Sequence, residues 1–191
     1  MILRTRGIST LIAKNIQLND ITRLYTDLLA SKAEIPTKMI TSGIVATIGD
    51  TVLQLAESKS SGFDWRRLLV FDLVAIFYIA PITHYWFLLL DSLPLFPSNK
   101  LLRATTMVCI DQCIGAIFIT AGFFIFFEFM NRCVLNLQQR HFETSLLTSV
   151  SQSCRYNLWP TLLANWCYWP IANFFNFLVI PVKYRLLTLT I

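Results

Sequence analysis

The feature that most constrains the fold is an uncharged, mostly apolar stretch of 27 residues, from Tyr156 to Val182, bounded by Arg155 and Lys183. A helix needs about 20 mostly apolar residues to cross the hydrocarbon core of a bilayer. In lipid, every backbone polar group must be bonded within the protein, and a helix achieves this inside a single segment. The stretch therefore predicts a membrane-spanning helix and a protein that folds in a bilayer.

Three further apolar stretches cover residues 39–56, 68–90 and 104–127. Only 14% of the 191 residues are charged, against about 25% in a typical soluble protein. We therefore expect an all-α integral membrane bundle of about four transmembrane helices, over residues 39–56, 68–90, 104–127 and 156–182, with short connectors. Prolines inside the spans predict kinks, because each removes a helical hydrogen bond.

The N-terminal segment, residues 1–38, differs from the expected transmembrane domain, residues 39–191. Its first nineteen residues include Arg4, Arg6 and Lys14 and no acid. This pattern favours a mitochondrial targeting segment, while near-helical apolar spacing over residues 11–30 is typical of a surface helix. The formal net charge is +5, but the basic residues are scattered between apolar runs. We therefore expect contact with membrane lipids and no nucleic-acid partner.

Polar side chains recur at helical spacing inside the apolar stretches. A charged group in hydrocarbon is costly and normally faces the bundle interior or a water-filled cavity. One interpretation is a polar lumen whose acids favour cations. The other is that these groups hold helices together through hydrogen bonds, and the sequence leaves both open. The candidate pore-lining or helix-contact residues are Asp50, Gln54, His84, Asp111, Gln112, Asn165, Trp169 and Asn176.

Two neighbouring patterns extend this interpretation. Gly115 and Gly122 share a helix face with Asp111, which predicts close approach of another helix beside the acid. Asp72 lies only a few residues into its span, beyond Arg66 and Arg67. A local ion pair at the membrane interface is the expected role for Asp72.

The sequence offers little for catalysis. It contains no HExxH, GxSxG, P-loop or GxGxxG motif. With two histidines, and five cysteines that form no CxxC pair, it offers no recognisable metal site. We expect no enzymatic activity, no metal and no cofactor.

Several elements occur in the order of a known family. The densest is Asn165-Trp166-Cys167-Tyr168-Trp169-Pro170, followed by Asn176-Phe177, Pro181 and Tyr184-Arg185. Upstream lie Pro81-Ile82-Thr83-His84-Tyr85-Trp86, Asp91 and Asp111-Gln112. Over roughly residues 21 to 185 the chain resembles the Mpv-seventeen/22-kDa peroxisomal membrane protein family. The residues that match its signature are Pro81, Trp86, Asp91, Trp166, Pro170, Phe177, Pro181 and Arg185.

The chain also departs from that family. Ala80 stands where a Gly is usual, Ile117 where Pro is usual, and Asn173 where Gln is expected. The family usually continues through another apolar stretch beyond the position of Arg185, so the resemblance implies a longer C-terminus than the one present here.

The resemblance implies a multi-pass protein of the mitochondrial inner membrane, with the peroxisomal membrane as the alternative. It also implies an organelle channel or small-solute transporter involved in organelle homeostasis. A non-conducting scaffold or assembly factor is the alternative function. The expected partners are membrane lipids, ions or small solutes, and a second copy of the chain in a homo-oligomer.

Overall fold

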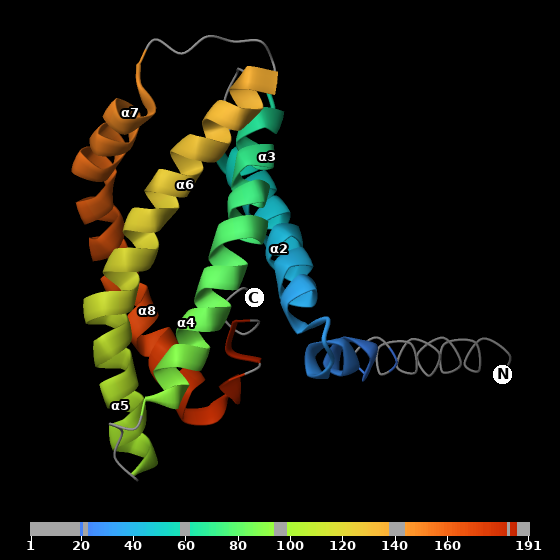
Figure 1. Cartoon of the computed structure of the whole chain (residues 1–191), viewed down its shortest axis with the longest axis vertical. Helices are drawn as coiled ribbons and strands as arrows, with labels where there is room; N and C mark the ends of the chain where they lie inside the picture. The colour runs from blue at the N-terminus through green and yellow to red at the C-terminus, as the bar shows by residue number, and fades with distance from the viewer. Residues whose placement is uncertain are drawn as a thin grey trace, which may run out of the picture. The chain divides into compact units, whose positions relative to one another are not determined.

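The computed structural model describes residues 20, 23–57, 62–93, 99–137, 144–182 and 184–186, and within them every regular element is a helix. This confirms the all-α fold expected from the apolar stretches. The elements drawn in Figure 1 are α2 (Glu34–Glu57), α3 (Trp65–Val74), η1 (Ala75–Ile79), α4 (Ala80–Ser92), α5 (Lys100–Ile110), η2 (Asp111–Gly115), α6 (Ala116–Leu137), α7 (Leu146–Ser153), η3 (Cys154–Leu158) and α8 (Trp159–Val179).

The helices after α2 join end to end through single π-helical turns. α3 runs through η1 into α4, α5 through η2 into α6, and α7 through η3 into α8. Figure 1 shows each of these series as one continuous rod. α5 lies against α8, α3 against α6, and α6 also contacts α7 and α8.

Two of the π turns have a cause in the sequence, because each lies just before a proline. Pro81 follows η1, and Pro160 follows η3. A proline ring clashes with the carbonyl four residues earlier. Those carbonyls belong to Phe77 and Tyr156, inside the π turns, and the wider turn gives the ring room. The predicted irregularity at these prolines thus takes the form of π turns, whereas Pro170 lies inside α8.

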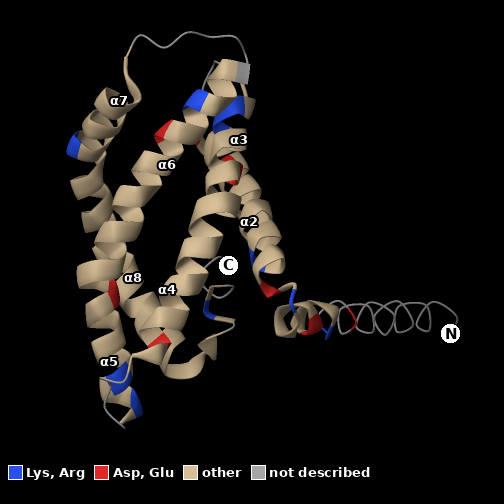
Figure 2. Cartoon of the chain, in the orientation of Figure 1, with Lys and Arg blue, Asp and Glu red and all other residues tan. Residues whose placement is uncertain are grey.

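Among the described residues, three helices are long and apolar enough to cross a membrane: Glu34–Glu57, Trp65–Ser92 and Lys100–Asn136. They contain the expected spans 39–56, 68–90 and 104–127. Figure 2 shows most of the charge of the α3–α4 rod and of the α5–α6 rod gathered toward the rod ends. The fourth expected span is a helix of 21 residues, α8, which is not among the three. Its asparagines Asn165, Asn173 and Asn176 lower its hydropathy.

The chain divides into two compact units, Met1–Thr37 and Lys38–Ile191. In the first, residues 23–30 are helical, in agreement with the C-terminal part of the expected surface helix. Residues 1–19, 21 and 22 lie outside the described residues, so the expected targeting segment is largely not described. The second unit contains all the rods.

Apolar side chains pack between the rods at two places. Near the α4–α5 end, Phe87, Leu90, Ala104, Met107 and Phe177 form one buried cluster. Val70 and Val74 of α3 pack with Val134 of α6 in another.

Two glycines let helices approach as closely as the sequence predicts. A Cβ added at Gly115 would lie 2.6 Å from the indole of Trp86. A Cβ added at Gly122 would collide with the hydroxyl of Tyr78, which donates to Ile119 O at 3.0 Å. Both glycines are therefore needed where α6 and η2 meet the α3–α4 rod.

Two expectations need correction. The connector between the expected spans 104–127 and 156–182 is shorter than those bounds imply, because α6 continues to Leu137 and α7 begins at Leu146. Asp72 does not pair with Arg66 or Arg67: it accepts hydrogen bonds from Thr47 Oγ1, 3.0 Å from each of its carboxylate oxygens. Arg67 instead pairs with acids of α2, one of which is the more deeply buried Asp50.

Candidate functional site

A cavity of about 380 Å³ lies between α4, η2, α6 and α8. Its wall is mostly apolar and aromatic, with acidic, amide and hydroxyl side chains among the lining residues. The lining residues are Ile79, Thr83, Trp86, Phe87, Asp111, Gln112, Ala116, Ile119, Thr120, Phe123, Thr161, Asn165, Trp169, Asn173 and Leu186. The volume falls within the range of ~300–1,000 Å³ that is usual for small-molecule pockets.

Asp111 is the only charged residue of this lining, and it is 6% exposed. Trp86 Nε1 donates to Asp111 Oδ1 at 2.7 Å. Gln112 Nε2 and Asn173 Nδ2 donate to Oδ2 at 2.8 and 2.6 Å. Hydrogen bonds to a carboxylate are stronger than neutral ones. Three neutral donors from α4, η2 and α8 thus stabilise one buried carboxylate.

Asp111 and its neighbour Gln112 are both buried, and both belong to the π turn η2. In η2 the Ala116 N–H donates to Asp111 O, five residues back, so the turn is wider than an α turn. Trp166 Nε1 donates to Gln112 O at 3.2 Å, which fixes the turn against α8.

Two amide oxygens beside the carboxylate have no hydrogen-bond partner: Gln112 Oε1 and Asn173 Oδ1. The orientation of each amide follows from its NH₂ group donating to Asp111, which leaves the oxygen facing elsewhere. A buried acceptor without a partner costs about 1–3 kcal/mol. The site therefore has unused capacity to accept hydrogen bonds.

The sequence candidates separate into different places. Asp111, Gln112, Asn165 and Trp169 line the cavity. Asn165 Nδ2 donates to Thr120 Oγ1 at 3.3 Å, across α8 and α6. Asn176 lies further along α8 and donates from Nδ2 to Arg185 O at 3.2 Å, outside the cavity lining.

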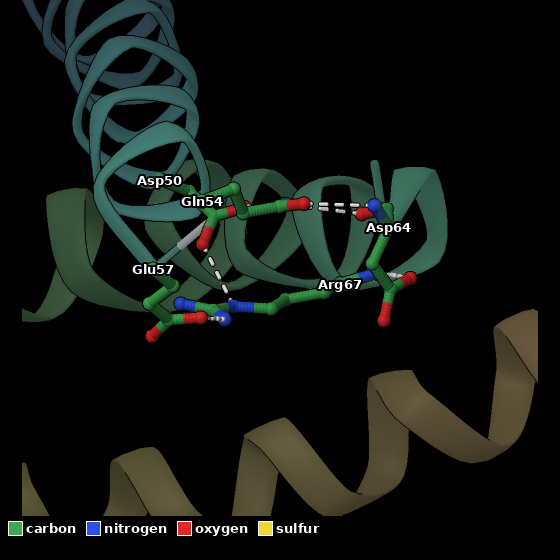
Figure 3. A network of polar contacts seen from close by, with 5 residues as sticks. All are labelled: Asp50, Gln54, Glu57, Asp64 and Arg67. Atoms are coloured by element: carbon green, nitrogen blue, oxygen red, sulfur yellow. Dashed lines mark hydrogen bonds and ion pairs between the residues drawn. The ribbon is translucent and has the colours of Figure 1, made fainter. Parts of the chain in front are cut away.

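Asp50 and Gln54 belong to a second polar cluster, between α2 and α3, which Figure 3 shows. Arg67 Nε lies 2.9 Å from Asp50 Oδ1, and Arg67 Nη1 lies 3.0 Å from Glu57 Oε2. Gln54 donates to Asp50 Oδ2 at 2.7 Å and exchanges two hydrogen bonds with the backbone of Asp64. These contacts join the end of α2 to the start of α3.

His84 is buried and is not among the residues that line the cavity. Its Nδ1 lies 2.9 Å from Lys38 Nζ at the start of α2. Both side chains are buried, at 6% and 3% exposure.

The residues that match the family signature sit at contacts between segments. Asp91 Oδ1 lies 3.0 Å from Arg103 Nη2 and 3.4 Å from Arg185 Nη1. Arg185 also donates from Nε to Ile180 O, and its guanidinium lies over the ring of Phe177. Burial lowers the pKa of Arg185, and the charge of Asp91 opposes this. Pro181 follows the end of α8, where the chain turns back toward Asp91.

Three residues of these polar clusters are not among the candidate pore-lining or helix-contact residues of the sequence: Asn173, Arg67 and Lys38. Asn173 had a signal, because it lies four residues after Trp169 and so shares the polar face of α8. The partners of Arg67 and Lys38 are on other helices, and one sequence gives no signal for such pairings.

The fold and the cavity define a class: an all-α multi-pass membrane protein with a partly open cavity between its helices, beside a buried carboxylate. A family model described as the Mpv17 / PMP22 family matches residues 142–191. Protein SYM1 of Debaryomyces hansenii is 31% identical over 175 residues, which cover 87% of this chain and 80% of that protein. The chain belongs to this family, as its signature residues predict, and it is a multi-pass organelle membrane protein.

Two other relatives extend the comparison. Peroxisomal membrane protein 2 of Bos taurus is 26% identical over 157 residues, covering 79% of this chain and 73% of that protein. PXMP2/4 family protein 3 of Dictyostelium discoideum is 27% identical over 176 residues, covering 92% of this chain and 86% of that protein. No solved structure matches the chain.

Proposed function

We propose that this protein is a non-enzymatic channel or transporter for small solutes in an organelle membrane. The observation that supports this is the cavity between the membrane helices, lined by Asp111, Gln112 and Asn173. An ionisable group inside a membrane segment is expensive and is a functional candidate by default. A cavity beside it gives a solute somewhere to lie during passage.

One observation favours the alternative, a non-conducting scaffold. Both oxygens of Asp111 already accept hydrogen bonds, from three different elements. Interhelical bonds of this kind hold membrane helices together, at about 0.6–2 kcal/mol each. In a scaffold, Asp111 would contribute stability and no selectivity.

Purified protein in planar bilayers separates the two functions. Single-channel current and reversal potential are recorded in a cation gradient for the natural protein, for Asp111→Asn and for the control Asp72→Asn. Asp72 is an acid on the α3–α4 rod that does not line the cavity. A pore predicts discrete openings whose cation preference falls in Asp111→Asn alone. No current from folded, monodisperse protein would favour the scaffold.

For the location we propose the mitochondrial inner membrane, with the peroxisomal membrane as the alternative. The acid-free basic start supports mitochondria, whereas the name of one relative, Peroxisomal membrane protein 2, places that relative in peroxisomes. A fusion of residues 1–40 to a fluorescent reporter tests the mitochondrial location. Import into mitochondria is the expected result, and a reporter that stays cytosolic would contradict it.

A further inference from the structure

We propose that the cavity is a binding site for a small organic ammonium ion, that is, a primary amine with an apolar body. The inference deepens the proposed function by naming its solute class, and it rests on that function for its role in transport. Three features of the site support it: an uncompensated charge, unused acceptors and aromatic walls.

The first feature is the charge of the site. The partners that the structure shows for Asp111 are the neutral groups of Trp86, Gln112 and Asn173, and no lysine, arginine or histidine is among the residues that line the cavity. A buried carboxylate without a cation carries a large desolvation cost that neutral donors only partly offset. A cationic solute would complete the pairing, and an anionic solute would meet repulsion.

The second feature is the kind of hydrogen bond the site still lacks. Gln112 Oε1 and Asn173 Oδ1 are buried acceptors without partners. An ammonium head group has three N–H donors and no acceptor. The carboxylate of Asp111 is the acceptor that lines the cavity, and the two amide oxygens, each with less than 1 Å² of exposed surface, would accept only after the amides turn toward the cavity.

The third feature is the remainder of the wall. Trp86, Phe87, Phe123 and Trp169 line the cavity together with aliphatic side chains. Aromatic faces attract cations and also pack against apolar groups. An inorganic cation would make no apolar contacts with this wall, so the wall favours an ammonium ion that carries an apolar group.

Equilibrium binding of tritiated phenethylamine tests the proposal. The protein is placed in nanodiscs of phosphatidylcholine, a lipid without a primary amine, and empty discs are subtracted. We expect one saturable site from which phenylacetate, the anion of similar size, does not displace the probe. Equal displacement by phenylacetate would overturn the charge argument. Displacement by phosphatidylethanolamine added to the discs would assign the site to a lipid amine and overturn the solute assignment.

Two pairs of variants locate the site. Asp111→Asn is expected to weaken binding at least about tenfold, because it removes a charged hydrogen-bond partner, while Asp72→Asn changes it less than about twofold. In Ala116→Phe the carboxylate of Asp111 remains, but the new ring occupies the cavity, so phenethylamine binding should be lost. The control is Ile117→Phe, because the side chain of Ile117 is 37% exposed and does not line the cavity. Full affinity in folded Ala116→Phe would place the amine elsewhere.

The binding experiment and the bilayer experiment test two different proposals, so one proposal can be wrong while the other holds. Saturable binding that depends on Asp111 supports the ammonium site even where bilayers stay silent, and then only the proposed transport is wrong. Bilayers that conduct, together with no saturable phenethylamine binding, would retain the channel and overturn the ammonium site.

Discussion

Replacing Gly115 with alanine tests whether the close contact with Trp86 holds the buried carboxylate in place. The new Cβ would lie 2.6 Å from Cε2 and Cζ2 of the indole and 2.7 Å from its Nε1. Carbon atoms in ordinary contact are about 3.5–4.0 Å apart. The indole therefore has to move by about 1 Å, which breaks or bends its 2.7 Å hydrogen bond to Asp111.

The expected loss of stability follows from these contacts. Overpacking a filled site costs about 1–3 kcal/mol, and a lost hydrogen bond to a charged group costs about 1.5–3 kcal/mol. The helix propensity of alanine returns up to about 1 kcal/mol. We expect Gly115→Ala to lower the free energy of unfolding by about 2–4 kcal/mol.

Unfolding of the purified protein in mixed micelles, followed by circular dichroism as the fraction of denaturing detergent rises, measures this quantity. Gly49→Ala is the matched control, because a Cβ at Gly49 would meet nothing within 4 Å. It should be neutral or stabilising by up to about 1 kcal/mol. In a Trp86→Leu background, the cost of Gly115→Ala should shrink by at least about 1 kcal/mol, since the indole atoms in contact are gone.

If Gly115→Ala is as stable as Gly49→Ala, the indole contact does not constrain the helices. A loss in Gly115→Ala that stays the same with Leu at position 86 would show that the cost arises elsewhere.

The remaining predictions use the same unfolding measurement unless stated. Arg67→Gln leaves the buried Asp50 without its cation, so its free energy of unfolding should be about 1–3 kcal/mol lower than that of Arg66→Gln. Equal losses in the two variants would contradict the role of the Arg67–Asp50 pair. Tyr78→Phe, which removes a hydroxyl bond between two rods, should lose about 0.5–1.5 kcal/mol. Asp91→Asn should speed tryptic cleavage after Arg185 several-fold, because the ion pair that holds this buried guanidinium is removed, and an unchanged cleavage rate would contradict it.

The helices could be predicted from the sequence because their cause is local. The expected spans 39–56, 68–90 and 104–127 each fall inside a helix of the structure. The length of an apolar run and the thickness of a bilayer are enough for that prediction. The extension of α6 to Leu137 was missed, because Glu128 and Arg132 made that part look like a connector.

The candidate site could be predicted only within single helices. Spacing correctly places Asp111 and Gly115 on one face, but it carries no information on which helix that face meets. Asp50 and Asp111 therefore looked like two acids of one lumen, whereas the structure places Asp50 with Arg67 and Asp111 with Trp86. His84 similarly pairs with Lys38, 46 residues away, rather than with the cavity.

The π turn η2 contains three of the residues that form the site. Five consecutive residues, Asp111–Gly115, supply the carboxylate, the amide of Gln112 and the glycine that admits Trp86. π turns occur mostly as single-turn bulges, often at functional sites, and no proline explains this one. η2 places the carboxylate of Asp111 and the amide of Gln112 on the cavity wall, within one turn of the glycine that Trp86 contacts.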